Sequence, residues 1–257
     1  MFYFRTLIFS LSLSCAAPVK SEPIMSMSRG FTVSLEDLSG RVLPVHSHRG
    51  GAFIEGRMGE AYVVRFDNPT AQRVEVVATV DGRDVVSGEP GDYARQRGYI
   101  VEPFGSLRIP GFRRSLSEVA QFRFTGPGDS YSSRRGTPEN VGVIGVAVFG
   151  QAAPPPTAYR NRDDSDNEQS KGAQAPAMEA PADERGNLGT QFGETRGAPV
   201  VEVPFVRARP SAPDAVLAAY YDDREGLIRR GIISQPALSL PGPQPFPENQ
   251  RFAVPPP

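Results

Sequence analysis

Hydrophobic and polar positions alternate in short runs along residues 31–151, and turn-forming residues separate these runs. Two of them, residues 61–66 (AYVVRF) and 73–80 (RVEVVATV), are rich in the β-branched and aromatic side chains that favour strands. Further runs of this kind cover residues 31–35, 83–86, 98–101, 106–109 and 120–124. Many short strands joined by turns, with no long amphipathic helix among them, are typical of antiparallel sandwiches. We therefore expect a mainly β chain with an antiparallel β-sandwich domain over residues 29–151.

Three short stretches indicate how these strands are connected. The sequence DNPT at residues 67–70 ends one strand, because Asn hydrogen-bonds the local backbone and Pro fixes φ. The pair DG at residues 81–82 lies between two strands, where a two-residue hairpin turn needs positive φ at both positions. Residues 115–119 (SLSEV) indicate about one helical turn, because a serine followed three residues later by Glu has the spacing of a capping box.

The most apolar stretch after the amino-terminal region is ENVGVIGVAVFG at residues 139–150. Its apolar part is far too short to cross a membrane as a helix. A phosphate-binding loop would need a following helix, but the chain continues into three prolines at residues 154–156. We interpret residues 141–149 as the last, central strand of the sandwich, with Gly142 and Gly145 allowing close approach of a neighbour.

The composition changes at residue 152, and the chain divides into three further parts. Residues 152–186 are rich in Pro, Ala and charged residues, which predicts a disordered linker. Residues 187–234 predict a small β-hairpin plus helix element. Residues 235–257 form a proline-rich tail that favours a polyproline conformation.

The hairpin-helix element is expected to contain two strands at residues 200–206 and 215–221, followed by a short helix. Asp222 or Asp223 caps this helix, and Gly231 follows its end. A piece of this size is small for an independent core without disulfides. We therefore expect it to dock on the sandwich, so that a truncation after Ala152 lowers the melting temperature.

Residues 1–21 have the pattern of an export signal, with Arg5 before a short apolar core and small residues at the end. Cleavage after Ser21 fits the small-residue rule, and cleavage after Ala17 is an alternative. Cys15, the one cysteine of the chain, offers a second processing route in which the protein is lipid-anchored. With cleavage after Ser21, the mature protein contains no disulfide and no thiolate. We expect an exported protein of the periplasm or the extracellular space.

Charge and composition limit the classes of partner. Apolar residues make up 39% of the chain, and its 26 prolines and 26 glycines indicate a compact part joined to segments that cannot bury a core. The formal net charge is −1, whereas nucleic-acid-binding proteins are usually strongly basic. The composition thus argues against a nucleic-acid partner, and no segment of the mature chain is long and apolar enough to span a membrane.

The two histidines of the chain, His46 and His48, form the weak candidate metal site. On a strand, residues i and i+2 point to the same side, so both imidazoles could bind one ion. A third ligand would have to be Asp or Glu, and no motif identifies one. The same pair supports one alternative function, a metal-dependent hydrolase.

Catalytic motifs are otherwise missing from the sequence. It contains no G-x-S-x-G nucleophile elbow, and a Ser–His–Asp triad would need a histidine from the one loop that has them. The acidic pairs at residues 163–164 and 222–223 are explained as a solvated linker and a helix cap. We assign no catalytic residue and no cofactor.

Arginines and aromatic residues gather in the sequence between residues 93 and 135. If the loops of the sandwich converge, this region presents a cationic surface suited to an anionic glycan, lipid headgroups or an acidic protein. The alternative is that the aromatic residues lie in the core and each arginine pairs locally. The candidate ligand-binding residues are Arg95, Arg97, Arg113, Arg114, Arg134 and Arg135.

Several segments of the chain resemble a group of uncharacterised exported bacterial proteins. The segments are VDGRDVVSG (residues 80–88), RGYIV (97–101), GFRRS (111–115), NVGVIGVAVF (140–149) and YYDDREGLIRRGI (220–232). The resemblance covers about half of the chain and implies a bacterial, exported origin. It implies no activity, so no functional residue is carried over.

The function that these observations favour is a non-catalytic binding or structural module of the bacterial cell envelope or extracellular space. Its partner would be an envelope or extracellular protein or an anionic glycan. One alternative is an accessory protein that docks on a secretion or surface-assembly partner. The metal-dependent hydrolase using His46 and His48 is the other.

Overall fold

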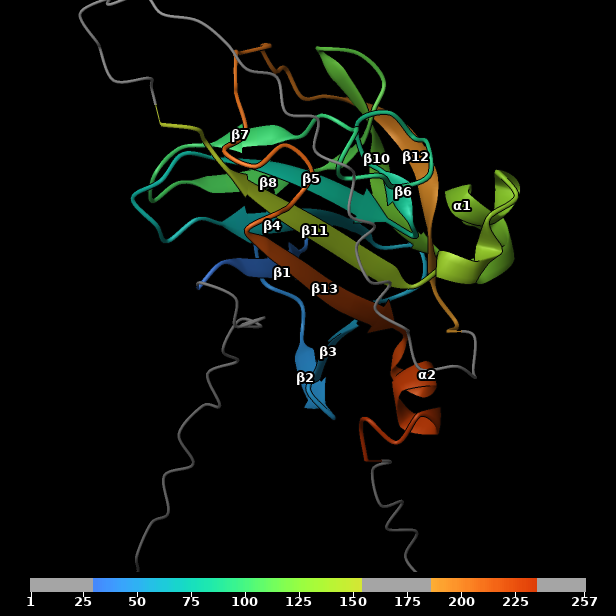
Figure 1. The fold of residues 1–257 in the computed structure, drawn as a ribbon. Coiled ribbons are helices and arrows are strands. Elements are labelled where there is room, and N and C mark those ends of the chain that lie inside the picture. Colours follow the sequence, from blue (N-terminus) through green and yellow to red (C-terminus); the bar gives the residue numbers. More distant parts are fainter. Residues whose placement is uncertain (1–29, 154–185, 235–257) are drawn as a thin grey trace, which may run out of the picture.

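The strands form two β-sheets packed face to face (Figure 1). Most buried apolar side chains lie between these sheets, and Val77, Ala147 and Phe149 form a separate small cluster. The computed structural model describes residues 30–153 and 186–234. The mainly β, two-sheet fold class is thereby confirmed. The predicted leader at residues 1–21, the tail at 235–257 and nearly all of the predicted linker at 152–186 lie outside the described residues.

The first sheet is antiparallel and has the strand order β1-β4-β10-β12. Two short strands, β8 and β9, complete it: β8 pairs with β4, and β9 pairs with β10. Strands β4 and β10 pair directly only at Tyr62 with Phe122 and at Ala61 with Arg123, and they diverge beyond these residues. Strands β8 and β9, which are separated only by Pro110, lie in the fork between them. The bounds are β1 (Thr32–Glu36), β4 (Ala61–Asp67), β8 (Ser106–Ile109), β9 (Gly111–Arg113), β10 (Glu118–Thr125) and β12 (Gly189–Gly197).

The second sheet has the order β2-β3-β13-β11-β5-β6, with β7 pairing to β5. Its strand β13 is antiparallel to β11 but parallel to β3, so the sheet is mixed. The bounds are β2 (Val45–His48), β3 (Gly51–Glu55), β5 (Val74–Val80), β6 (Arg83–Asp84), β7 (Tyr99–Val101), β11 (Val143–Gly150) and β13 (Ala215–Asp222).

Helices are short in this fold. Two 3₁₀ turns, η1 (Pro127–Asp129) and η2 (Pro138–Asn140), flank α1 (Tyr131–Arg134), and α2 (Arg224–Arg229) follows β13. The predicted cap of α2 is confirmed, since the Asp223 side chain accepts a hydrogen bond from the Gly226 N–H at 2.7 Å. Within the described ranges, none of the helices combines the length and the apolar character needed to cross a membrane.

The core between the sheets is rich in aromatic residues. Tyr62 of β4 stacks on Phe122 and Phe124 of β10, with ring centroids 5.3 and 4.3 Å apart. Each fully buried large side chain of this kind contributes about 1.5–3 kcal/mol relative to an exposed one. The largest fully buried side chains are Tyr62, Tyr221, Phe66, Phe112, Phe122, Phe124, Phe149, Leu35, Ile54, Ile109, Ile144 and Leu188.

The predicted central strand is confirmed as β11, which lies between β13 and β5. The predicted close approach at Gly145 is also seen, because a Cβ atom there would lie 2.7 Å from the Thr79 hydroxyl oxygen. The two-residue hairpin turn forms as predicted, with positive φ at Asp81 (53°) and Gly82 (72°) between β5 and β6. These three features depend on local sequence chemistry, which is why the sequence reveals them.

The helical turn predicted at residues 115–119 is wrong. The Ser115 side chain accepts hydrogen bonds from the N–H groups of Ser117 and Glu118, at 3.2 and 3.1 Å, and so closes a turn between two strands. Glu118 is already the first residue of β10. In a helix cap and in a tight turn, the serine side-chain oxygen accepts a hydrogen bond from a backbone N–H two or three residues later. The spacing between Ser115 and Glu118 therefore does not tell the two structures apart.

The predicted hairpin in residues 187–234 is also wrong. Residues 200–206 form no strand, whereas residues 189–197, which were not predicted, form β12. The other expected strand is present as β13. Strands β12 and β13 do not pair with each other, because β12 joins the first sheet and β13 lies inside the second. This region is therefore part of the sandwich and does not dock on it as a separate hairpin.

Candidate binding surfaces

The two histidines lie on the hairpin of β2 and β3. The Nε2 atom of His46 is 3.3 Å from Glu55 Oε2, and the ring of His48 packs edge-on against Phe53. The same Glu55 carboxylate is 3.3 Å from the guanidinium of Arg224. Among the described residues, no group of three or more His, Cys, Asp or Glu side chains is placed to hold a metal ion. The hairpin thus brings one histidine, His46, within contact of one carboxylate, Glu55. The metal-site and hydrolase hypotheses would have to start from this pair.

The six candidate arginines lie on three segments, and each has a local partner. Those partners are Asp92 for Arg95, Glu202 for Arg97, Tyr99 and Ala198 for Arg113, Thr195 for Arg114, Asp129 for Arg134, and Glu89 for Arg135. The aromatic residues of this region divide: Phe112, Phe122 and Phe124 are in the core, but Phe104 is 73% exposed. These contacts agree with the alternative in which each arginine pairs with a nearby residue. Ligand binding by the six arginines stays a prediction.

A polar cluster lies inside the core, where both sheets meet the turn after β5. Asp81 Oδ1 accepts hydrogen bonds from the Tyr221 hydroxyl at 2.5 Å and from the Gly142 N–H at 2.9 Å. Its Oδ2 atom accepts from the Thr190 N–H at 2.8 Å. The Thr190 hydroxyl lies 2.7 Å from the Tyr221 oxygen and 2.6 Å from the Tyr62 oxygen. The cluster therefore joins β4 and β12 of the first sheet to β13 and β11 of the second.

Burial sets the electrostatics of this cluster. It raises the pKa of Asp81 to about 6, although the bonds from Tyr221, Gly142 and Thr190 favour the charged form. The pKa of the Tyr221 hydroxyl is raised by burial and by the negative charge of Asp81. Because these groups satisfy one another in a closed interior, the cluster stabilises the packing of the two sheets.

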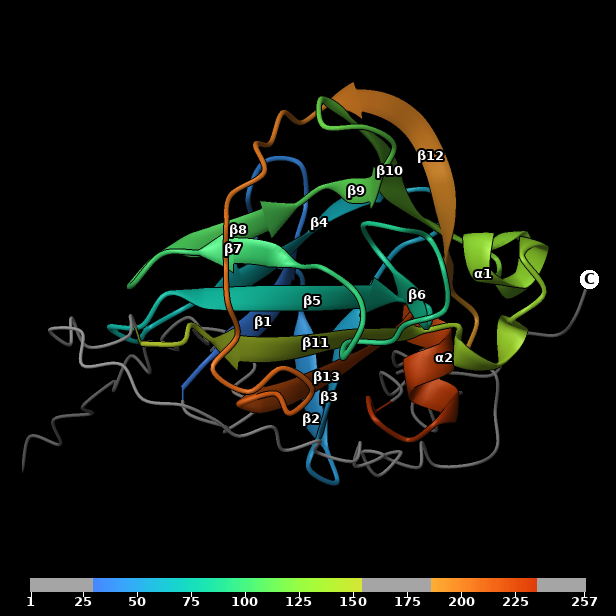
Figure 2. The ribbon, with the colours of Figure 1, turned by 45° about the horizontal axis from the view of Figure 1, so that its top comes forward.

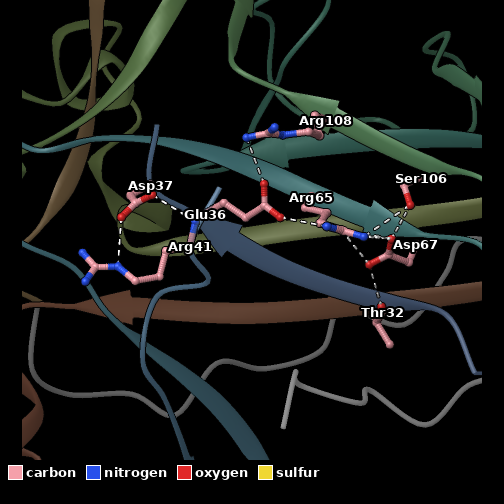
Figure 3. Close-up of polar contacts among 8 residues, drawn as sticks. All are labelled: Thr32, Glu36, Asp37, Arg41, Arg65, Asp67, Ser106 and Arg108. Atoms are coloured by element: carbon pink, nitrogen blue, oxygen red, sulfur yellow. Dashed lines mark hydrogen bonds and ion pairs between the residues drawn. The ribbon is translucent and has the colours of Figure 1, made fainter. Parts of the chain in front are cut away.

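Charged side chains form a row across the outer face of the first sheet (Figure 3). The carboxylate of Glu36, which is only 1% exposed, lies 3.0 Å from Nη1 of Arg65 and 3.0 Å from Nη2 of Arg108. Arg65 also donates to Asp67 at 2.9 Å. Glu36, Arg65, Asp67 and Arg108 are hereafter named the charged row. Two guanidinium groups thus compensate the one nearly inaccessible carboxylate.

The ion pairs of the charged row favour the ionised forms of Asp67 and Arg65. Burial acts to raise the pKa of Asp67, but hydrogen bonds from Arg65 and Ser106 lower it below its usual value. Hydrogen bonds to Asp67 and to Glu36 raise the pKa of Arg65. The row adds opposite charges in equal number, so it forms a polar but nearly neutral surface.

A hollow of about 330 Å³ lies beside the charged row, at the fork between β4 and β10. Leu38, Val63 and Pro110 form its apolar walls, and Arg108 and Arg196 bring guanidinium groups to it. Gln121 of β10 also lines it. Gln121 is 0% exposed, and both atoms of its side-chain amide make no hydrogen bond with the described residues. The hollow therefore combines cations, apolar walls and an unsatisfied amide.

The segment at residues 198–208, hereafter named the strap, connects β12 to β13 across the second sheet. Figure 2 shows it running past β7 and β5 to the start of β13. At one end, the Val200 N–H donates to the Leu116 carbonyl at 2.8 Å. At the other end, the Ala208 N–H donates to the Gly150 carbonyl at 2.9 Å. The strap is thus fixed to the sandwich at both ends.

Arg207 is the main side-chain anchor of the strap. Its guanidinium lies 3.8 Å from the ring centroid of Phe149, and its Nε donates to Glu75 Oε2 at 2.7 Å. Its two Nη atoms donate to four backbone carbonyl oxygens: those of Tyr93, Ala94, Gln96 and Pro210. A planar guanidinium suits such a site, because its rigid fork can satisfy several acceptors at once.

The middle of the strap is apolar and exposed. Val201 is 82% exposed, Val203 44% and Val206 68%. Within the part of the chain that the structure describes, the backbone N–H groups of Val201, Glu202, Val203 and Phe205 make no hydrogen bond. The strap therefore presents unpaired backbone and β-branched side chains together.

The sequence did not single out Gln121, Arg196, Arg207 or the core role of Asp81. Gln121 is one polar residue in an alternating strand, and Asp81 is read as a turn residue. The weak signals for the strap are its run of valines and the proline within it, which were interpreted as a strand.

No protein-family model, no curated protein and no solved structure matches the chain. Inference about its function rests on its own sequence and geometry.

Proposed function

We propose that the protein is a non-catalytic binding module, exported by a bacterial cell, that docks on a protein partner through its strap. This unites the binding-module hypothesis with the docking alternative for an accessory protein. Export to the periplasm or the extracellular space is supported by the signal-like pattern of residues 1–21 and by the resemblance to exported bacterial proteins.

The observation that carries the proposal is the exposed middle of the strap. Singly exposed apolar side chains are ordinary, but Val201, Val203 and Val206 are exposed along one extended segment. Their neighbouring backbone N–H groups are unpaired within the described residues. Extended segments with free backbone groups bind other proteins by adding a strand, and the side chains beside them supply specificity.

The chemistry of the strap limits how a partner strand binds. Pro204 has no N–H group and the Val200 N–H is bonded to Leu116, so continuous strand pairing is limited to residues 201–203. Glu202 is 3.0 Å from Arg97, which holds the middle of the segment close to the loop before β7. The expected partner therefore offers a short extended segment with apolar side chains.

Site-specific photocrosslinking in the cells that produce the protein tests this proposal. A benzoyl-phenylalanine probe replaces Val201 or Val203, and a probe at Met58, which is 58% exposed, serves as the control. We expect the same crosslinked protein from both strap positions and none from the control position. Equal crosslinking from all three positions, or no crosslinked protein at either strap position, would contradict the proposal.

A double substitution, Val201→Ser with Val203→Ser, separates binding from stability. Both side chains are exposed, so the free energy of unfolding should change by no more than about 0.5 kcal/mol. With the probe placed at Val206, which is 68% exposed, in both the wild type and the variant, loss of the crosslinked partner with unchanged thermal unfolding is the expected result. Retention of the partner by this variant would show that the valines do not bind it.

A further inference from the structure

The hollow at the fork of the first sheet has an unusual floor. A primary amide carries both a donor and an acceptor, and in Gln121 both are buried and unpaired among the described residues. Leaving such groups unsatisfied destabilises a folded protein, whereas an apolar residue of similar size would not. Val119, two residues earlier on the same face of β10, is apolar and 0% exposed, so this face of the strand accommodates apolar side chains.

The groups above this floor are suited to a negative charge. Arg196 is exposed on β12; it forms no close ion pair among the described residues, although its charge lowers the pKa of Glu194, which pairs with Arg123. Arg108 has its Nη2 atom 3.0 Å from Glu36, and that carboxylate is shared with Arg65, so the row as a whole is compensated. Arg196 therefore gives the hollow its excess positive charge. A guanidinium binds a carboxylate in a bidentate manner, which fixes the orientation of the ligand.

The walls and the size define the rest of the ligand. Leu38, Val63 and Pro110 line the hollow with apolar surface. Its volume of about 330 Å³ is near the lower end of the range for ligand sites, about 300–1,000 Å³. Leu38 is 48% exposed and the Arg108 side chain 50%, so both lie at the rim, where side-chain rotation opens a path to the buried amide.

We propose that this hollow binds the carboxyl end of a peptide whose last residue is apolar. The terminal carboxylate pairs with Arg196 and Arg108, and the last side chain lies against the apolar walls. The amide of Gln121 donates to the carbonyl oxygen and accepts from the N–H of the penultimate residue, which point to the same side of an extended chain. This site lies on the first sheet, at the residues that precede the strap, and it does not depend on the docking proposed above.

Nuclear magnetic resonance of the full chain tests the site directly. The probe is the dipeptide acetyl-Ala-Leu with a free carboxylate, and its C-terminal amide is the matched control. We expect saturable shifts of the Gln121 side-chain NH₂ signals with the acid, and binding of the amide weaker by at least about tenfold because a charge-assisted contact is lost. No saturable shift, or equal affinity for acid and amide, overturns the proposal.

Three variants connect the binding to the named residues. Arg196→Gln should weaken binding of the acid by at least about tenfold. Arg41→Gln is the control, because Arg41 is 78% exposed and pairs with Asp37 outside the hollow; its binding should be unchanged. Gln121→Leu should abolish binding while keeping or raising the melting temperature. Equal weakening by both arginine variants, or unchanged binding by Gln121→Leu, overturns the proposal.

The source of the peptide end is distinguished by presenting the same Ala-Leu sequence at the end of a flexible linker on a folded carrier protein. Binding of carrier and free dipeptide with similar affinity indicates that protein termini are the ligands. Binding of the dipeptide alone indicates that the hollow takes small peptides. Both results retain the carboxylate chemistry, and binding of a carrier that ends in an amide would contradict it.

Discussion

The two described stretches of the chain contribute to the sandwich in different ways. Residues 30–153 supply eleven strands, most of which pair with strands of the same stretch. Residues 186–234 supply only β12 and β13, which lie in different sheets. Most buried apolar residues of the shorter stretch therefore belong to the same core as those of the longer one. Closeness in sequence does not identify the structural unit here.

Two buried carboxylates of the longer stretch bind groups of the shorter stretch. Glu75 is paired with the guanidinium of Arg207, whereas Asp81 accepts hydrogen bonds from the uncharged groups of Thr190 and Tyr221. The first carboxylate is compensated by an opposite charge, and the second is surrounded by neutral donors. This difference explains why burial raises the pKa of Asp81 to about 6.

The largest effect is expected from separating the two stretches. A chain that ends at Ala152 lacks β12, β13 and α2, so β10, β11 and β3 each lose one of their neighbouring strands. We expect it to show no cooperative thermal unfolding transition, measured by circular dichroism. Co-expression with a second chain that begins at Gly186 should restore the transition. A truncated chain that melts like the full protein would refute the integral role of these strands.

The next largest effect is expected from Arg207→Ala. Removing this guanidinium leaves Glu75 buried and uncompensated, which should lower the free energy of unfolding by about 3–5 kcal/mol in urea titrations. Arg97→Ala is the matched control, because its pair with Glu202 also holds the strap but is 80% and 66% exposed. Its cost should stay below about 1 kcal/mol. Similar losses for the two variants would contradict the distinction between buried and exposed anchors.

A smaller effect, dependent on pH, is expected from Asp81. The pKa of Asp81 is about 6 in the folded protein against an ordinary value of 3.8, so the folded state binds this proton more tightly than the unfolded chain does. The contribution of this bound proton to the free energy of unfolding is fully present below pH 3.8 and is lost as the pH rises through about 6. The shift corresponds to about 3 kcal/mol.

The comparison with Asp81→Asn isolates this contribution, because other carboxylates shift in both directions. The free energy of unfolding of the wild type, minus that of the variant, should fall between pH 4 and pH 6.5 and then level off. Urea titrations across this range measure the difference. A difference that is constant with pH, or that rises, would show that Asp81 is not the group that binds the proton.

Local chemistry explains which parts of the fold could be predicted from the sequence. The Asp81-Gly82 turn, the central strand β11 and the Asp223 cap each follow from a few neighbouring residues. The strand β12 could not be predicted, because its sequence GTQFGETRG is polar and glycine-rich. Its pairing with β10, which lies far away in the sequence, is what makes it a strand.

The candidate surfaces show the same limit. The valines at residues 200–206 favour a strand by propensity, but the anchors of the strap keep them extended and unpaired. Gln121 fits an ordinary alternating strand, and only the burial of its amide sets it apart. Both features depend on contacts between distant residues, which a single sequence does not specify.

The place of β13 between β3 and β11 has a consequence for biogenesis. A chain that leaves the ribosome or a translocation channel from its amino end releases β3 and β11 first, and the strand that joins them emerges only with residue 222. Pairing between segments so distant in sequence is slow, because the intervening loop must close first. Completion of the second sheet therefore has to wait until β13 has emerged. Until then the nascent chain retains open strand edges, on which holding chaperones or transport factors can act.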